Sequence, residues 1–152
     1  MFNASLAKYE EELDYPWDHY FGVDLRPMLQ GRTVLDLGSL TGGRGAAWAE
    51  RYGLKHLIGV DVNELYVESA RRFAASRGIS AEYRLARGEA IPLKDESVDA
   101  VLSFDVLEHV QEPGRVLSEC HRVLKHKGMA FIVFPSYYQP IEHHLGLVTR
   151  WV

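Results

Sequence analysis

Short apolar runs alternate with helical patterns from Arg32 onward, and this alternation limits the possible folds more than any other feature of the chain. We expect strands at 33–38, 56–61, 81–88, 98–104 and 128–134, with helical patterns between most of them. The apolar runs show no clean alternation of apolar and polar residues, which is typical of strands that are buried on both faces. The sequence therefore predicts an α/β class fold, a doubly wound parallel sheet covered by helices on each side.

Two of the expected helices carry their own start and stop signals. Asn63 is a suitable N-cap for a helix over 63–78, and Gly78 can adopt the left-handed conformation that ends it. Pro113 fits the first turn of a helix over 112–126, which we expect Gly128 to close. Cys120 lies within the apolar stripe of that second helix, so we interpret it as a buried core thiol and not as a nucleophile.

A glycine-rich turn over 38–45 follows the first expected strand and precedes a helix. Such a turn brings backbone N–H groups to the carboxyl edge of the sheet, where doubly wound folds bind ligands. A dinucleotide fingerprint needs a middle glycine for close approach to a pyrophosphate, but the spacing here is Gly38, Leu40 and Gly43. Asp36 would also repel phosphate charges. The turn therefore favours a ligand with positive charge and no phosphate.

At these residues the sequence resembles the class I S-adenosylmethionine-dependent methyltransferases. Asp36, Gly38 and Gly42 match the first motif of that family, whereas Leu40 stands where the family usually has its middle glycine. The resemblance extends over about residues 32–135. It implies S-adenosyl-L-methionine as cofactor and a Rossmann-like, mainly parallel sheet. We expect five strands in the order 3-2-1-4-5, without the usual sixth and seventh strands.

The later motifs of the family imply roles for further residues. Asp61 matches the acidic residue that accepts hydrogen bonds from the ribose hydroxyls. Glu89 stands at the position that binds the adenine amino group, although the family usually has the shorter aspartate there, and the N–H of Ala90 would bind a ring nitrogen. Val62 and Phe104 are expected to pack on the adenine. The implied cofactor-binding residues are thus Asp36, Gly38, Ser39, Gly42, Asp61, Val62, Glu89, Ala90 and Phe104.

The reaction that this resemblance implies is an in-line displacement of a methyl group by a nucleophile on a small-molecule or sugar-like acceptor. Positioning is the main contribution of the protein, and a base becomes useful when the acceptor is a hydroxyl or a protonated amine. His109 is the candidate catalytic residue, with His143 and His144 as further bases. We expect no metal site at Glu142, His143 and His144, because adjacent histidines in an extended loop point apart.

Two other functions compete with this interpretation. One is a regulatory or scaffold subunit that binds S-adenosylmethionine without a complete acceptor site; Leu40, Glu89 and the short stretch after the fifth expected strand favour this alternative. The other is an NAD-dependent oxidoreductase, which the glycine spacing and Asp36 argue against.

The sequence divides into three segments of one domain. Residues 1–31 contain an expected helix over 8–13 and an aromatic run, and we interpret them as a lid over the cofactor. Residues 32–135 form the cofactor-binding core, and residues 136–152 an acceptor-side loop or a tail. Because the fifth strand would be an unprotected sheet edge, we expect the tail or a second copy of the chain to cover it, as in a homodimer. The chain reads as a member that is truncated after the fifth strand.

Composition sets the remaining limits. A chain of 152 residues with one cysteine folds without disulfides and suits a reducing, cytoplasmic location. It has 17 Lys and Arg against 21 Asp and Glu, so that electrostatic binding to nucleic acid is disfavoured. No apolar stretch approaches the length of a membrane span, and we expect no membrane association.

Overall fold

Five parallel strands form the centre of the computed structural model, which describes residues 1–16, 18–135, 141–142 and 147–148. Their spatial order is β3-β2-β1-β4-β5, and all neighbouring pairs are parallel. The predicted class, direction and strand order are therefore confirmed. The strands are β1 (Thr33–Leu37), β2 (His56–Asp61), β3 (Ala81–Leu85), β4 (Val98–Phe104) and β5 (Leu124–Val133).

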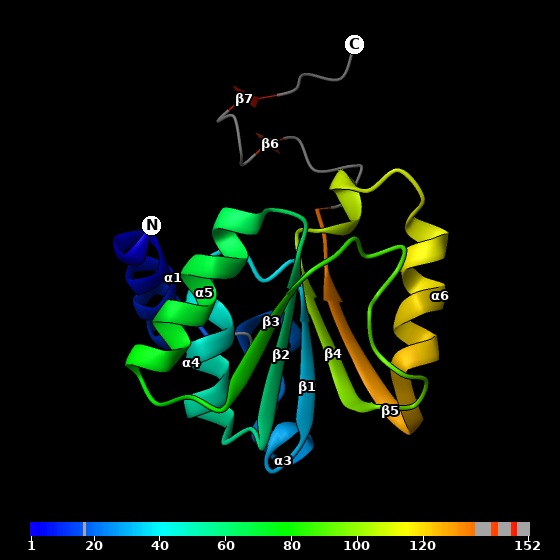
Figure 1. Ribbon diagram of the computed structural model, residues 1–152, viewed down its shortest axis with the longest axis horizontal. Coiled ribbons are helices and arrows are strands. Elements are labelled where there is room, and N and C mark those ends of the chain that lie inside the picture. Colours follow the sequence, from blue (N-terminus) through cyan, green and yellow to red (C-terminus); the bar gives the residue numbers. More distant parts are fainter. Residues whose placement is uncertain (17, 136–140, 143–146, 149–152) are drawn as a thin grey trace.

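Helices cover both faces of this sheet. Figure 1 shows α4 and α5 on one face, with α1 beside them, and α6 on the opposite face. No helix of the described residues combines the length and the apolar character needed to span a membrane. The helices are α1 (Phe2–Asp14), α2 (Asp18–Phe21), α3 (Arg26–Leu29), α4 (Gly43–Tyr52), α5 (Glu64–Ser76), α6 (Pro113–Val123) and the 3-10 helix η1 (Leu107–His109).

The central strands carry apolar residues on both faces because successive side chains enter different cores. In β1, Val34 belongs to the core that contains Trp48 of α4. The next residue, Leu35, belongs to the core that contains Val116 of α6. Both β1 side chains are fully buried. This two-sided burial explains why the sequence of the strand does not alternate between apolar and polar residues.

The local signals at α5 are confirmed. The Asn63 side chain accepts hydrogen bonds from the N–H groups of Leu65 at 3.0 Å and Tyr66 at 3.4 Å. Gly78 has a φ of +67° just after the helix. Both ends of α5 were thus encoded locally.

The predicted end of the helix over 112–126 is wrong. Helix α6 begins at Pro113 as expected but ends at Val123, and β5 already starts at Leu124. The cause is sheet pairing, because Leu124 lies opposite Val98 of β4. Cys120 remains in the core as predicted, where burial raises the pKa of its thiol to about 11.

Helix α1 is longer than the predicted 8–13 helix and is docked on the body of the domain. Its fully buried Ser5 hydroxyl donates to the carbonyl of Thr41 at 2.8 Å, which ties α1 to the glycine-rich loop. Its Tyr9 hydroxyl donates to Glu50 of α4, and the guanidinium of Arg77 lies 3.9 Å from the centre of the Tyr9 ring. The lid role of residues 1–31 stays a prediction.

Two short strands follow the main sheet. Strands β6 (Ile141–Glu142) and β7 (Leu147–Val148) pair antiparallel with one another in a separate two-stranded sheet. Within the described part of the chain the main sheet therefore has five strands, as expected. The predictions for His143, His144 and most of the tail fall on residues outside the described ones, so the cover of β5 and the homodimer stay predictions.

Candidate functional site

The glycine-rich loop after β1 has a backbone conformation that only some residues adopt easily. Gly38 and Gly42 have φ values of +77° and +78°. A Cβ on Gly38 would lie 2.3 Å from Cγ2 of Val106, and one on Gly42 would lie 2.6 Å from Cβ of Ala70. Both positions therefore require glycine for two independent reasons, conformation and space.

Leu40 lies in the middle of this loop with a φ of +46°. A leucine in the left-handed region is strained, and glycine would fit this backbone without cost. The backbone at Leu40 nevertheless adopts the left-handed conformation that the family's usual glycine would favour at this position. Leu40 is 45% exposed, so its side chain extends from the loop.

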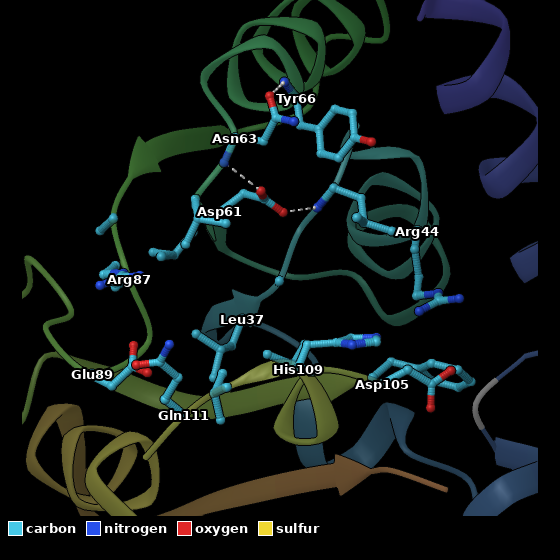
Figure 2. A pocket seen from close by; sticks show the side chains of 18 of the residues that line it. Leu37, Arg44, Asp61, Asn63, Tyr66, Arg87, Glu89, Asp105, His109 and Gln111 are labelled. Atoms are coloured by element: carbon cyan, nitrogen blue, oxygen red, sulfur yellow. Dashed lines mark hydrogen bonds between the residues drawn. The ribbon is translucent and has the colours of Figure 1, made fainter. Parts of the chain in front are cut away.

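Asp61 holds this loop from the end of β2. One carboxylate oxygen accepts the N–H of Leu40 at 2.8 Å, and the other accepts the N–H of Asn63 at 2.9 Å (Figure 2). Asp61 is 7% exposed. Asp61 is therefore a candidate ligand residue that also stabilises the backbone at Leu40 and at Asn63. The sequence pattern did not reveal this structural role.

A pocket of about 650 Å³ opens at the carboxyl edge of the sheet, in front of this loop. Arg87 and Glu89 lie at one end of it, and Arg44 and Asp105 at the opposite end (Figure 2). The pocket is thus elongated along the carboxyl ends of the strands, where a doubly wound sheet binds its ligand.

Asp36 lies behind the loop, and the pKa of its carboxyl is unusually high. It is 3% exposed, and its Oδ2 atom has no hydrogen-bond partner among the described residues. Burial raises the pKa of its carboxyl to about 7, which the nearby Arg44 opposes and the charge of Asp61 supports. Together with Ser39, Asp36 lines a small hollow that shares Gly38, Leu40 and Arg44 with the main pocket. A buried carboxylate without a partner suits a positively charged ligand group.

Most of the predicted site residues come together at these two cavities. Gly38, Asp61, Val62, Glu89, Phe104 and His109 line the main pocket, and Asp36, Gly38 and Ser39 line the small hollow. Gly42 and Ala90 line neither cavity. Gly42 shapes the loop, whereas the N–H of Ala90 donates to the carbonyl of Arg87 at 3.1 Å.

Arg44 is a pocket residue that sequence reasoning missed. Its guanidinium carbon lies 4.0 Å from the centre of the Phe104 ring, and its Nε atom lies 3.5 Å from a carboxylate oxygen of Glu12 in α1. Phe104 therefore belongs to the end of the pocket that contains Arg44 and Asp105. This end lies away from Glu89 (Figure 2), so the position of Phe104 does not fit its expected packing on an adenine bound at Glu89. The position of Arg44 directly after the glycine-rich turn was a signal that could have identified it.

Lys8 and Asp105 were also missed. Lys8 reaches both cavities from α1, and nothing in the local sequence connects it with the glycine-rich loop. Asp105 follows β4 with a φ of +52°, a conformation that is uncommon outside functional or tightly turned segments. The ring of His109 points toward the end of the pocket where Asp105 and Arg44 lie (Figure 2).

The donor and acceptor set of the site fits S-adenosylmethionine. The buried carboxylate of Asp36, which lines the small hollow, suits a cationic ligand group, and Leu40 occupies the position where a pyrophosphate site needs its middle glycine. Each oxygen of Asp61 accepts one backbone N–H, so lone pairs remain on both for a ligand diol.

Comparison with known proteins agrees with this assignment. Residues 35–132, well over half of the chain, match the family described as "Methyltransferase domain". An uncharacterised methyltransferase of Mycobacteroides abscessus is 37% identical over 135 residues, which are 86% of this chain and 49% of that protein. The ubiquinone biosynthesis O-methyltransferase of Hahella chejuensis is 36% identical over 109 residues, which are 68% of this chain and 43% of that protein.

Solved structures show the same fold. A putative methyltransferase from Bacillus halodurans superposes with a TM-score of 0.66 and 30% identity, covering 71% of this chain and 47% of that one. The chain spans about half the length of the curated relatives that it matches. The family match, the fold and the geometry of the pocket lead to one conclusion: the chain belongs to the class I S-adenosylmethionine-dependent methyltransferases.

Proposed function

We propose that this domain binds S-adenosylmethionine in the pocket and transfers its methyl group, by in-line displacement, to a hydroxyl of a small-molecule acceptor. When bound, S-adenosylmethionine supplies a methyl group on a positively charged sulfur. The observation that carries the proposal is the buried carboxylate of Asp36, whose Oδ2 atom has no hydrogen-bond partner in the part of the chain that the structure describes; this carboxylate lines a small hollow that adjoins the pocket of about 650 Å³.

Asp36 provides the negative charge for the cationic end of the cofactor. Because its pKa is raised to about 7 by burial, the carboxyl is partly protonated near neutral pH in the free protein. A cation in the neighbouring hollow would favour the ionised form and lower this pKa again. Binding and ionisation of Asp36 are therefore coupled in this proposal.

Asp61 and Glu89 bind the nucleoside part. Asp61 is held by the N–H groups of Leu40 and Asn63, so its orientation is fixed before the ligand arrives. Its free lone pairs accept the two ribose hydroxyls. Glu89 lies at the end of the pocket away from Arg44 (Figure 2), where its carboxylate accepts a hydrogen bond from the adenine amino group.

The opposite end of the pocket receives the acceptor. It contains Phe104, whose ring lies against the guanidinium of Arg44, together with Asp105 and His109. Phe104 excludes water, and His109 is the group that accepts the proton of an acceptor hydroxyl. The names of the O-methyltransferase relatives support a hydroxyl as the acceptor group.

The direct test is a calorimetric titration with S-adenosylhomocysteine, with NAD as the competing ligand class. We expect saturable binding of S-adenosylhomocysteine and none of NAD. A screen of small phenols and catechols with labelled S-adenosylmethionine then identifies the acceptor class, with His109→Gln as the variant that binds cofactor but methylates hydroxyls slowly.

Two results would overturn the proposal in different ways. No binding of S-adenosylhomocysteine would remove the cofactor assignment. Binding without methyl transfer to any acceptor would favour the regulatory or scaffold subunit, in which the cofactor site is intact and the acceptor site is not.

A further inference from the structure

The loop between β3 and β4 forms one wall of the pocket but has no helix or strand of its own. Ala86, Arg87 and Glu89 from this loop line the pocket. An irregular segment must find partners for its backbone N–H and C=O groups outside itself. The position of Glu89 therefore depends on whatever fixes this loop from outside.

A single arginine of α6, Arg122, binds three residues in the second half of the loop. The guanidinium of Arg122 donates to the carbonyl of Ile91 at 2.9 Å and to that of Leu93 at 2.8 Å. It also donates to the carboxylate of Asp95 at 2.7 Å. One side chain thus holds three acceptors that lie within five consecutive residues of the loop.

Glu119, one turn earlier on α6, completes the arrangement. Its carboxylate accepts the N–H of Ile91 at 2.8 Å and two hydrogen bonds from Arg122, each at 2.7 Å. The hydrogen bonds that Arg122 donates lower the pKa of Glu119, and donating to the carboxylates of Glu119 and Asp95 raises the pKa of Arg122, so both groups are charged near neutral pH. A planar fork that binds a carboxylate through two bonds is geometrically specific, and lysine cannot reproduce it.

The loop is thereby fixed two residues from Glu89. Both backbone polar groups of Ile91 are bound by the Glu119–Arg122 pair. The Ile91 side chain is 3% exposed and packs in the core that contains Val116 of α6. Neither residue of the pair lines the pocket, so the pair acts on a ligand only through the loop.

We propose that Glu119 and Arg122 are positioning residues that set the preference of the site for adenine over other purine bases, an inference that rests on the proposed function. They hold the loop so that the carboxylate of Glu89 meets the exocyclic amine of the base. A carboxylate in this position accepts from the amine of adenine and repels the carbonyl oxygen of hypoxanthine. Such discrimination requires a fixed carboxylate, because a mobile Glu89 side chain could move away from the carbonyl oxygen of hypoxanthine and avoid the repulsion.

The test compares S-adenosylhomocysteine with S-inosylhomocysteine, in which a carbonyl oxygen replaces the exocyclic amine of the base and the neighbouring ring nitrogen carries a hydrogen. Their affinities are measured by calorimetry for the wild type and for Arg122→Ala. The matched control is Arg115→Ala, an arginine of the same helix whose ion pair with Glu112, at 3.6 Å, is exposed to solvent. Thermal unfolding of each variant reports on the fold.

We expect Arg122→Ala to bind S-adenosylhomocysteine about tenfold more weakly, a loss of one well-placed hydrogen bond to a charged group, while S-inosylhomocysteine changes less than about threefold. The ratio of the two affinities therefore falls. Arg115→Ala should keep the wild-type ratio. Arg122→Lys, which retains the charge but not the fork, should give an intermediate ratio.

An equal weakening of both ligands by Arg122→Ala would overturn the inference, because a merely structural role lowers both affinities together. If Arg122→Ala does not fold, a wild-type ratio in Arg122→Lys overturns it in the same way. Failure of the wild type to bind S-adenosylhomocysteine at all would overturn the proposed function and this inference with it, so the two failures are distinguishable.

Discussion

Replacing Asp36 with asparagine should stabilise the free domain at neutral and alkaline pH while weakening its binding of cofactor. The carboxyl is 3% exposed, and burial raises its pKa from an ordinary 3.8 to about 7. Asparagine has almost the same shape and never carries the buried charge. The stability of the wild type therefore includes a pH-dependent cost that the variant lacks.

The sign of the effect follows from proton binding. Between about pH 4 and pH 7 the folded state keeps the Asp36 proton whereas the unfolded chain has released it, as the two pKa values require. In this window each unit of rising pH lowers the free energy of unfolding by about 1.4 kcal/mol. Below the window both states are protonated, and above it the cost is constant. From pH 5 to pH 8 nearly two units fall within the window, so the wild type should lose about 2.5 kcal/mol relative to the variant.

Urea unfolding of both proteins without ligand, at pH 5, 6, 7 and 8, measures this difference. All other titrating groups are shared, so they cancel when the two free energies are subtracted. A difference that stays constant over this range, or a variant that becomes the less stable protein at pH 8, would refute the assignment of a raised pKa to Asp36.

Asp99→Asn is the control with the opposite sign. Partial burial raises the pKa of Asp99, but the N–H of Thr33 and the ammonium of Lys125 lower it by more, so the net pKa is below its ordinary value. Stability from such a group is complete above its unfolded pKa and is lost only in acid. Asp99→Asn should therefore be less stable than the wild type by a constant amount from pH 5 to pH 8.

The substitution Asp36→Asn should lower the affinity for S-adenosylhomocysteine although it raises the free energy of unfolding. Asp36→Asn removes the charge that faces the ligand cation, and we expect the affinity to fall by about tenfold or more at pH 8. In the wild type the affinity should decrease as the pH falls below 7, because the carboxyl must then lose a proton on binding. Equal affinities of variant and wild type at pH 8 would separate Asp36 from the cofactor.

Three further substitutions test the loop and the helix that covers it. Gly43→Ala places a Cβ 1.9 Å from the carbonyl oxygen of Ser5, so we expect limited proteolysis to cleave α1 faster in this variant. The lid prediction adds that S-adenosylhomocysteine protects α1 from cleavage. Gly114→Ala, whose Cβ would have no neighbour within 4 Å, is the control. Leu40→Gly relieves a left-handed backbone with a φ of +46° and should raise the free energy of unfolding by about 1 kcal/mol in urea. Asp61→Ala removes the acceptor of two loop N–H groups and should lower that free energy by about 2 kcal/mol, in addition to weakening S-adenosylhomocysteine in calorimetry.

Each of these predictions has a contradicting result. Equal cleavage of the Gly43→Ala and Gly114→Ala proteins would show that α1 does not depend on the close approach to Ser5. A destabilised Leu40→Gly would mean that the side chain stabilises the loop more than its backbone strains it. If Asp61→Ala has the stability of the wild type, Asp61 does not stabilise the two loops and its role is limited to ligand binding.

Local sequence determined where the five strands and the main helices occur, as well as the glycine-rich loop, although β3 ends at Leu85 and not at 88, and β5 begins at Leu124 and not at 128. Asn63 caps α5 through its own side chain, and Gly38 and Gly42 are needed where the backbone has a positive φ. The strand order also followed from the resemblance, because the motif series occurs in the order that the family requires. These features depend on neighbouring residues and on backbone geometry, so they can be predicted without knowledge of the contacts between distant segments.

Contacts between distant parts of the chain decided the rest. Helix α6 ends at Val123 because Leu124 pairs with Val98, and Asp61 is a structural residue because it accepts from Leu40, 21 positions away. The link between Arg122 and the wall of the pocket joins α6 to a loop about 30 residues earlier, with no shared pattern in the sequence. The raised pKa of Asp36 likewise results from complete burial, which several elements produce together. Hydrogen bonding and desolvation depend on which groups meet in space, and only the tertiary structure determines that.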